Sequence, residues 1–146
     1  MTDVALQVAP AGDVVVADLW TNAVPDFGGV RAVRVEPRRW WLIDAGDIAA
    51  TIAGQIADSG TTIAIGGGLV RATLTGPGWR PLLMLAAVFD AEDPRFGPGN
   101  CAATILHHVP VWIVPVAADC AEVYFAASYA RGLTDLWTAA IDRGIV

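Results

Sequence analysis

The spacing of apolar residues along the chain predicts short strands interleaved with three helices. Alternating apolar and polar positions are typical of strands, and apolar residues at i, i+4 and i+8 are typical of a helix with one buried face. We expect strands at residues 4–8, 14–20, 30–36, 38–44, 61–65, 69–75, 102–108, 111–116 and 122–126. We expect helices at residues 48–57, 79–88 and 129–143. This order favours an α+β fold of ferredoxin-like character, with antiparallel sheets and packed helices.

Cap residues and apolar stripes define the helices further. Asp47 and Ser128 are the expected N-caps of the first and third helices, and Gly144 is the expected stop of the third. The side chains expected to be buried are Ile48, Ile52 and Ile56 in the first helix and Leu133, Leu136, Trp137 and Ala140 in the third.

Turn residues separate the strands. The first two strands are expected to be joined by a turn at 10–13. Pro110 and Pro115 make the 111–116 strand an edge strand or a bulged one. With 146 residues, the chain is expected to form a single domain over 1–146, in which 1–36 is an N-terminal strand arm.

The densest turn chemistry lies in residues 89–100. Pro94 and Pro98 fix φ near the value that turns require, and Gly97 and Gly99 permit positive φ, so we expect residues 93–100 to form an ordered loop. Phe96 lies in the middle of this loop. An aromatic side chain in such a place either packs down as an anchor or reaches out to a partner.

The composition is unusually apolar for a small domain. Hydrophobic residues make up 55% and charged residues 16%, against roughly 45–50% and 25% in ordinary soluble domains. We therefore expect another chain to cover a large apolar face. The alternative is an alanine- and valine-rich protein from a GC-rich genome that has no such partner.

Charge and run lengths exclude several classes of function. The net charge of −6 argues against nucleic-acid binding and against docking on an anionic membrane. No apolar run reaches the roughly 18 residues of a membrane span, and the first residues do not resemble a signal peptide. A cytoplasmic protein is expected, with Cys101 and Cys120 as reduced thiols.

Two adjacent tryptophans mark a second place where a partner is expected. Neighbouring residues on a strand point to opposite faces, so Trp40 and Trp41 cannot enter the same core. One of them should meet a second layer or a partner subunit. In the alternative interpretation, helices of this domain cover both.

The candidate chemistry in the sequence is sparse. His107 and His108 are adjacent on a predicted strand, where they cannot chelate one metal together. The triglycine at 66–68 lacks the Lys-Ser/Thr of a phosphate loop, so we interpret it as a tight turn or bulge. The acidic cluster Asp90, Glu92 and Asp93 has two interpretations, paired acids or loop caps. We therefore expect no catalytic, cofactor-binding or metal-binding residue in this chain.

Several short motifs resemble one known family in their order and spacing. They are Asp90, Pro94-Arg95-Phe96, Gly99, Cys101-Ala102, Thr104, Val109-x-Val111-x-Ile113 and Ser128-Tyr129-Ala130. From about Trp40 to the C-terminus, the chain resembles the gamma subunit of heterotetrameric sarcosine oxidase, which is similar to the folate-binding domain of the glycine-cleavage T protein. This resemblance implies a T-protein-like fold. The candidate interface or motif residues are Trp40, Trp41, Asp90, Phe96, Gly99, Thr104, Trp112 and Tyr129.

The resemblance implies a non-catalytic structural subunit of a heterotetramer that oxidises and demethylates N-methyl amines. Its partners would be a large and a medium flavoprotein subunit, and FAD, FMN, NAD, tetrahydrofolate and zinc would all be held by partner subunits. The chain departs from the family at 64–67, where a polar Asp-x-Ser-like run is replaced, and at Ala127, where an arginine is usual. These departures favour scaffolding over folate handling. The alternatives are a stand-alone folate-binding aminomethyl- or methyltransferase-like domain and a self-associating structural module.

Overall fold

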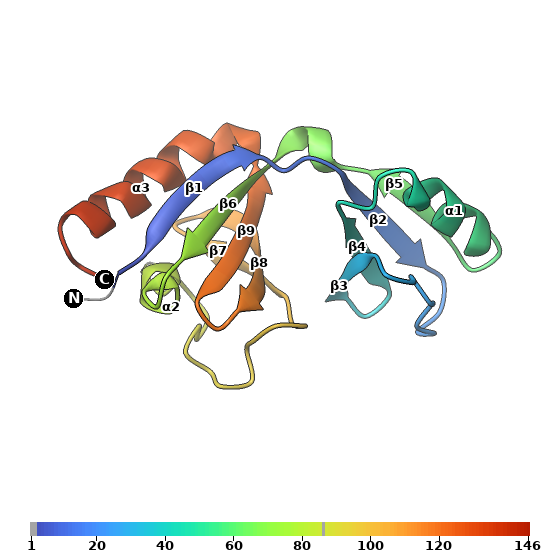
Figure 1. The fold of residues 1–146 in the computed structure, drawn as a ribbon, viewed down its shortest axis with the longest axis horizontal. Coiled ribbons are helices and arrows are strands. Elements are labelled where there is room, and N and C mark those ends of the chain that lie inside the picture. The colour runs from blue at the N-terminus through green and yellow to red at the C-terminus, as the bar shows by residue number, and fades with distance from the viewer. Residues whose placement is uncertain (1–2, 86) are drawn as a thin grey trace. The chain divides into compact units, whose positions relative to one another are not determined.

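The computed structural model describes residues 3–85 and 87–146, which form two antiparallel sheets and three α-helices (Figure 1). The predicted α+β class is confirmed at this level. Contacts divide the chain into two compact units, and the first of them is discontinuous in sequence. The first unit comprises Met1–Pro10 and Leu69–Val146, and the second comprises Ala11–Gly68.

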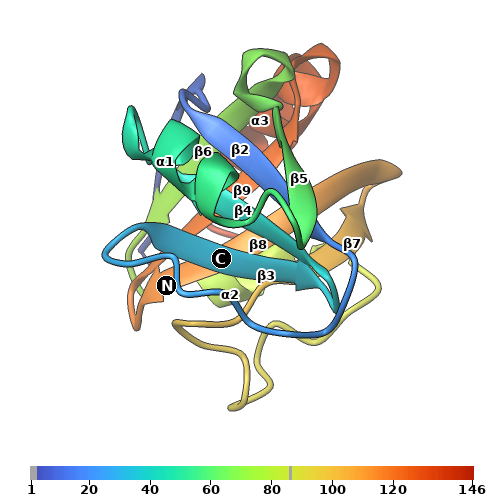
Figure 2. The same ribbon diagram turned by 90° about the vertical axis from the view of Figure 1, so that its right-hand side faces the viewer.

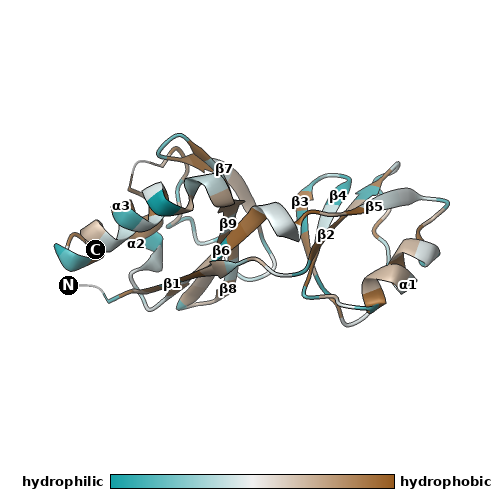
Figure 3. Cartoon of the chain, turned by 90° about the horizontal axis from the view of Figure 1, so that it is seen from above, coloured by the Kyte–Doolittle hydropathy of each residue, from teal (hydrophilic) through white to brown (hydrophobic). Residues whose placement is uncertain are grey.

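The first unit contains a five-stranded sheet in the order β1-β6-β9-β8-β7. These strands are β1 (Ala5–Pro10), β6 (Leu69–Thr75), β9 (Cys120–Ala126), β8 (Val109–Ala117) and β7 (Ala102–Leu106). Helices α2 (Trp79–Leu83) and α3 (Ala130–Asp142) pack on one face of this sheet. In the view of Figure 3, hydrophobic residues mark β6 and β9 in the middle of the sheet, and hydrophilic residues appear on α3.

The core of the first unit follows the alternation of its strands. Ala72, Leu74 and Val123 point to the helical face, where Trp137 of α3 lies in edge contact with Phe125 at 6.1 Å between ring centroids. Burying each large side chain of this kind contributes about 1.5–3 kcal/mol. The predicted burial of Leu133, Trp137 and Ala140 is confirmed, and Leu136 is partly buried.

The second unit is a four-stranded sheet in the order β3-β4-β2-β5, with one helix packed on it (Figure 2). Its elements are β2 (Val14–Leu19), β3 (Arg31–Glu36), β4 (Arg39–Ile43), α1 (Ile48–Gln55) and β5 (Gly60–Ala64). Ile52 and Ile56 bury themselves against Val15, Ala17 and Leu42 of the sheet. Ile48, which we expected to complete this stripe, is exposed.

The turn expected at 10–13 joins two strands that lie in different sheets. β1 pairs with β6 in the first unit, whereas β2 pairs with β4 and β5 in the second. Residues 1–36, expected as a strand arm, therefore supply strands to both sheets. That the two units form a single domain over 1–146 stays a prediction.

The N-terminal ends of α1 and α3 differ from the prediction, whereas the C-terminal end of α3 agrees with it. Asp47 lies at the N-cap of α1 without a side-chain capping hydrogen bond, and Ser128 lies within the 3-10 turn Ala127–Tyr129, which leaves Tyr129 at the N-cap of α3. Gly144 has a φ of +64°, and the N–H of Ile145 donates to the carbonyl of Ala140 at 3.0 Å. This is a Schellman motif, so the predicted stop of α3 is confirmed. The predicted 79–88 helix is shorter, because α2 ends at Leu83.

Of the two alternatives for the proline-containing strand, the edge position does not hold, because β8 lies between β7 and β9. The predicted bulge is present, since the register with β9 shifts between Pro115 and Ala117. Pro110 opposes Ile105 of the edge strand β7.

His107 and His108 lie in the two-residue turn between β7 and β8, and not on a strand as we expected. Their φ angles are +48° and +68°, the pattern of a type I′ hairpin turn. The triglycine forms a short 3-10 turn, Gly66–Gly68, which agrees with the predicted tight turn. Among the described residues, no helix is long and apolar enough to cross a membrane.

Candidate functional site

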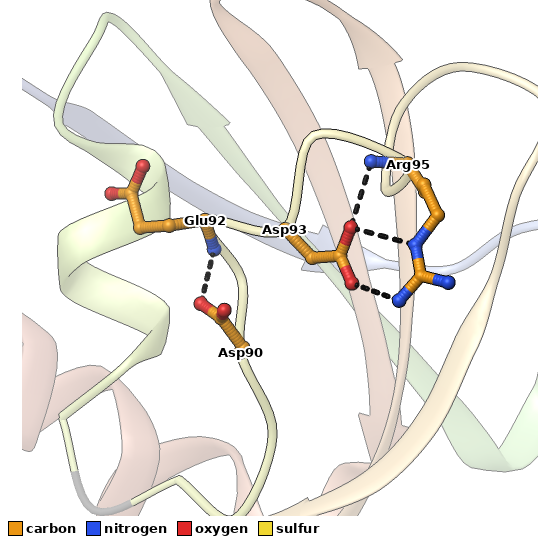
Figure 4. A network of polar contacts seen from close by, with 4 residues as sticks. All are labelled: Asp90, Glu92, Asp93 and Arg95. Atoms are coloured by element: carbon orange, nitrogen blue, oxygen red, sulfur yellow. Dashed lines mark hydrogen bonds and ion pairs between the residues drawn. The ribbon is translucent and has the colours of Figure 1, made fainter.

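The 89–100 loop is held in place by its own side chains (Figure 4). The Asp90 carboxylate accepts the N–H of Glu92 at 2.9 Å, which closes a small turn. The Asp93 carboxylate accepts the backbone N–H of Arg95 at 2.9 Å. It also accepts the Arg95 guanidinium at two points, Nε at 3.1 Å and Nη2 at 2.7 Å. The loop is therefore ordered, as its composition predicts.

The pairing with Arg95 changes the acid chemistry of Asp93. Hydrogen bonds from the Arg95 side chain and backbone favour the carboxylate and lower the pKa of Asp93 to about 2. A carboxylate so stabilised is a poor proton acceptor at neutral pH. Of the two interpretations of the acidic cluster, the loop-cap role matches the hydrogen bonds of Asp90 and Asp93.

Phe96 anchors the loop to the core of the first unit. Its ring is in T-shaped contact with Phe89, at 5.7 Å between centroids, and in tilted contact with Trp79 of α2 at 6.3 Å. Arg80 of α2 lies over the Trp79 ring and donates from Nη1 to the carbonyl of Ala91 at 2.6 Å. The loop and α2 are thus tied together by both aromatic and polar contacts.

The end of the loop turns at Gly99, whose φ of +94° is one that L side chains rarely adopt. Asn100 closes this turn, because its Oδ1 accepts the N–H of Gly97 at 3.0 Å. The motif glycine therefore has a conformational role.

An open concavity of about 470 Å³ lies over this loop. It is lined by Phe89, Asp90, Asp93, Arg95 and Phe96. The Arg95 side chain is 90% exposed although its guanidinium is paired. The concavity is open, and its lining combines two aromatic side chains with an exposed ion pair.

The two tryptophans of β4 point to opposite faces of the second sheet. Trp40 faces α1 and contacts Phe27 at 5.4 Å between centroids, with the Arg34 guanidinium at 5.5 Å from its ring. Trp41 opposes Val16 and Val33 on the other face and is buried. The alternation predicted for this pair is therefore observed, and the helical layer of this unit covers Trp40.

The remaining motif residues lie apart from the 89–100 loop. Thr104 is half-buried on β7, opposite Val111. Trp112 is half-buried on β8, opposite Ala103 and Tyr124. Tyr129, in the turn before α3, is 44% exposed. Of the eight candidate residues, the loop brings Asp90, Phe96 and Gly99 together. The other five lie on β4, on β7, on β8 and in the turn before α3.

A polar cluster that sequence reasoning missed lies on the sheet of the first unit, on the face away from α2 and α3. The Tyr124 hydroxyl donates to Glu122 at 2.9 Å, and Arg71 Nη1 lies 3.5 Å from the same carboxylate. The Arg71 guanidinium also lies 5.3 Å from the Tyr124 ring centre. The only sequence signal was a polar residue at alternate positions of two apolar strands, and the pairing register of β6 with β9 was needed to join them.

Metal and thiol chemistry find little support in the side-chain arrangement. Within residues 3–85 and 87–146, no three His, Cys, Asp or Glu side chains group as metal ligands would. Cys101 and Cys120 are free thiols. Burial raises the pKa of Cys101 to about 12, so this thiol stays protonated at neutral pH.

The described residues form an α+β fold with two antiparallel sheets and three α-helices. No protein-family model matches the sequence, and no curated protein matches it significantly.

Among solved structures, the fold is similar to that of a chain of heterotetrameric sarcosine oxidase from Corynebacterium sp. U-96, in complex with pyrrole 2-carboxylate. The TM-score is 0.80 at 15% sequence identity, and the match covers 96% of this chain and 84% of that chain. The resemblance to sarcosine oxidase that the motifs indicated is confirmed at the level of the fold. The T-protein-like fold stays a prediction.

Proposed function

We propose that this chain is a small, non-catalytic subunit of a sarcosine-oxidase-like complex that oxidises and demethylates N-methyl amines. The observation that carries the proposal is the fold, which matches a chain of a heterotetrameric sarcosine oxidase over nearly its whole length. The match covers most of both chains, so the matched chain is only slightly longer than this one. We therefore propose that this small chain stabilises the assembly, as a structural subunit of an oxidase heterotetramer would.

Exposed apolar side chains support a role in assembly. The described residues include Trp20, Val24, Ile63 and Val88, each more than 60% exposed. Solvent exposure of such side chains is unfavourable, and contact with another chain relieves it. The carboxylates of the 89–100 loop support the non-catalytic part of the proposal, because Asp90 and Asp93 are used in loop hydrogen bonds.

The partners and cofactors of this complex belong to the proposal. We propose a large and a medium flavoprotein subunit as partners, and we assign FAD, FMN, NAD, tetrahydrofolate and zinc to partner subunits. In this arrangement the chain contributes structure, and the amine is oxidised elsewhere in the complex.

The test is purification of the tagged chain from its host, with the visible spectrum and the masses of co-eluting chains recorded together. Flavin absorbance together with a large and a medium partner is the expected result. A colourless product without partners contradicts the proposal. Calorimetry with tetrahydrofolate on the isolated chain then tests the stand-alone folate-binding alternative, which predicts a saturable heat.

The loop is tested by Phe96→Ala. Loss of the contacts with Phe89 and Trp79 should destabilise the loop by about 1–2 kcal/mol and lower the yield of the complex. Leu136→Ala removes a partly buried apolar side chain from α3, outside the loop, and serves as the matched control for destabilisation. Equal complex yields from Phe96→Ala and the parent chain, both folded by circular dichroism, would refute a role for the loop in assembly.

A further inference from the structure

The sheet of the first unit has two edges, and they are protected differently. β7 forms one edge, and Leu106 at its end is bridged by Ala87. β1 forms the other edge and pairs with β6 alone. The six residues of β1 carry no charge, and the register with β6 runs without a bulge. Charged side chains, prolines and bulges usually protect natural edge strands from pairing with other chains, and of these β1 has only Pro10, at its end.

Alternate residues of β1 direct their backbone groups outward. The Asp3 carbonyl accepts the N–H of Gly78 at 2.9 Å, on the side of β6. In an antiparallel strand the N–H and C=O of one residue point to the same side, and those of the next residue point to the other. Ala5, Gln7 and Ala9 therefore bond to β6, and Val4, Leu6 and Val8 direct their backbone groups to the open edge. Pro10, which has no N–H, falls in the outward set, as expected of an edge proline.

A groove of about 340 Å³ runs between this open edge and α3, which lies alongside β1 (Figure 1). It is lined by Val4, Ala5, Leu6, Val8, Thr134, Thr138, Ile141 and Asp142. The side chains of Val4, Leu6 and Val8 pack partly against the core, so the wall on the strand side is apolar. The groove thus offers unpaired main-chain groups on one wall and a helix on the other.

We infer that this groove binds an extended segment of a partner protein, which adds a strand to the sheet beside β1. Main-chain hydrogen bonds to Val4, Leu6 and Val8 would hold the segment, and its inward side chains would lie against α3. Among the described residues that line the groove, Asp142 is the only charged one. With a chain charge of −6, it favours a segment with a basic side chain at that end. The inference rests on the first unit alone and does not depend on the proposed function.

The direct test fuses a model strand to the full chain. An alternating threonine-valine strand that ends in one arginine is attached after Val146 through a Gly/Ser linker of about 15 residues, which spans roughly 20 Å. Tethering gives the strand an effective concentration on the order of millimolar, so that even weak pairing becomes measurable. In the antiparallel orientation the terminal arginine reaches Asp142. Hydrogen exchange of single amides is followed by NMR in the fused and unfused chains.

The expected result is that the amides of Leu6 and Val8 exchange about tenfold or more slowly in the fusion, while the Gln7 amide, already paired with β6, is unchanged. Thr138→Lys places a long side chain in the groove and should abolish the slowing. Gly132→Lys adds the same charge to the same helix, at a position where an added Cβ meets open space, and should preserve it. Replacing the terminal arginine of the strand by glutamate should weaken the protection.

Three outcomes would overturn the inference. The first is equal exchange of Leu6 and Val8 in the fused and unfused chains. The second is equal behaviour of Thr138→Lys and Gly132→Lys when both are folded. The third is protection in the unfused chain that rises with its concentration, since the occupant would then be a second copy of this chain.

Discussion

At the scale of single residues, the Asp93–Arg95 pair defines what the candidate loop does with its charges. One carboxylate receives a backbone N–H and both arms of a guanidinium. These contacts use the acceptor capacity that a catalytic acid or base would need. The pair therefore fixes the loop conformation. The Phe96 ring, in the same loop, packs against Phe89 and Trp79.

The pKa of Asp93 gives a prediction at this scale. NMR titration of its carboxyl group should show a midpoint of about 2, and Arg95→Ala should return the midpoint toward about 3.9. Because the folded chain favours the carboxylate, the stability that this pair contributes is present above about pH 4 and is lost as the pH falls toward 2.

The control for this titration is Arg131→Ala, which removes the partner of Asp135, 4.0 Å away on α3. This variant should leave the Asp93 midpoint unchanged. An Asp93 midpoint that does not move in Arg95→Ala would show that the ion pair does not set the acidity of this carboxyl group.

At the scale of elements, the hairpin of β7 and β8 has residue types in its turn that do not suit the turn's backbone conformation. A type I′ turn requires positive φ at both central residues and favours Asn-Gly, yet His107 and His108 occupy these positions. Positive φ disfavours residues with a Cβ, although histidine adopts it more often than most residues.

Replacing His107-His108 by Asn-Gly should therefore stabilise the chain, by on the order of 1 kcal/mol. Urea unfolding checks this, with a higher midpoint and an unchanged slope as the expected result. The same Asn-Gly pair at 118–119, the two-residue connection between β8 and β9, is the control. Neither residue there has a positive φ, so no gain is expected. A lower midpoint for the 107–108 variant would mean that the imidazoles stabilise the turn.

Elements could be predicted from the sequence better than their pairing. Periodicity placed all nine strands that the described residues contain, and the cap glycine placed the end of α3. The position of β8 in its sheet was missed, because Pro115 is accommodated by a bulge inside the sheet. The Arg71–Glu122–Tyr124 cluster was missed because it joins residues about fifty positions apart, and only the strand register brings them into contact.

In the candidate site, local chemistry was predictable and packing was not. Prolines, glycines and acids of the 89–100 loop indicated an ordered turn, and its internal hydrogen bonds agree. The contacts of Phe96 with Phe89 and Trp79 depend on how α2 packs, which no local pattern specifies. Asp47 and Ser128 show the same limit: both have the residue type of a cap, yet Asp47 makes no capping bond and Tyr129 occupies the N-cap of α3.

At the scale of the whole molecule, the second unit is an insertion in the first. Pro10 opposes Val70 across β1 and β6, so the first-unit strands that flank the inserted segment are neighbours in one sheet. A short Gly-Asn linker in place of residues 11–68 should therefore leave the first unit folded. The dispersion of amide NMR signals checks whether the shortened chain is folded. Circular dichroism should show a single cooperative unfolding transition. A chain that stays unfolded would show that the first unit needs the second.

The same pairing of Ala5 with Thr75 has a consequence for how the protein is made. On the ribosome, β1 emerges before β6 and has no strand partner in its sheet while the intervening unit is synthesised, roughly 3–12 s at ordinary elongation rates. During this interval the backbone N–H and C=O groups on both edges of β1, a strand without charged side chains, have no strand partner. Folding of the first unit cannot be completed from the N-terminus onward, and refolding of the full chain from denaturant should be slower than that of the chain without the insertion, because loop closure must precede β1–β6 pairing.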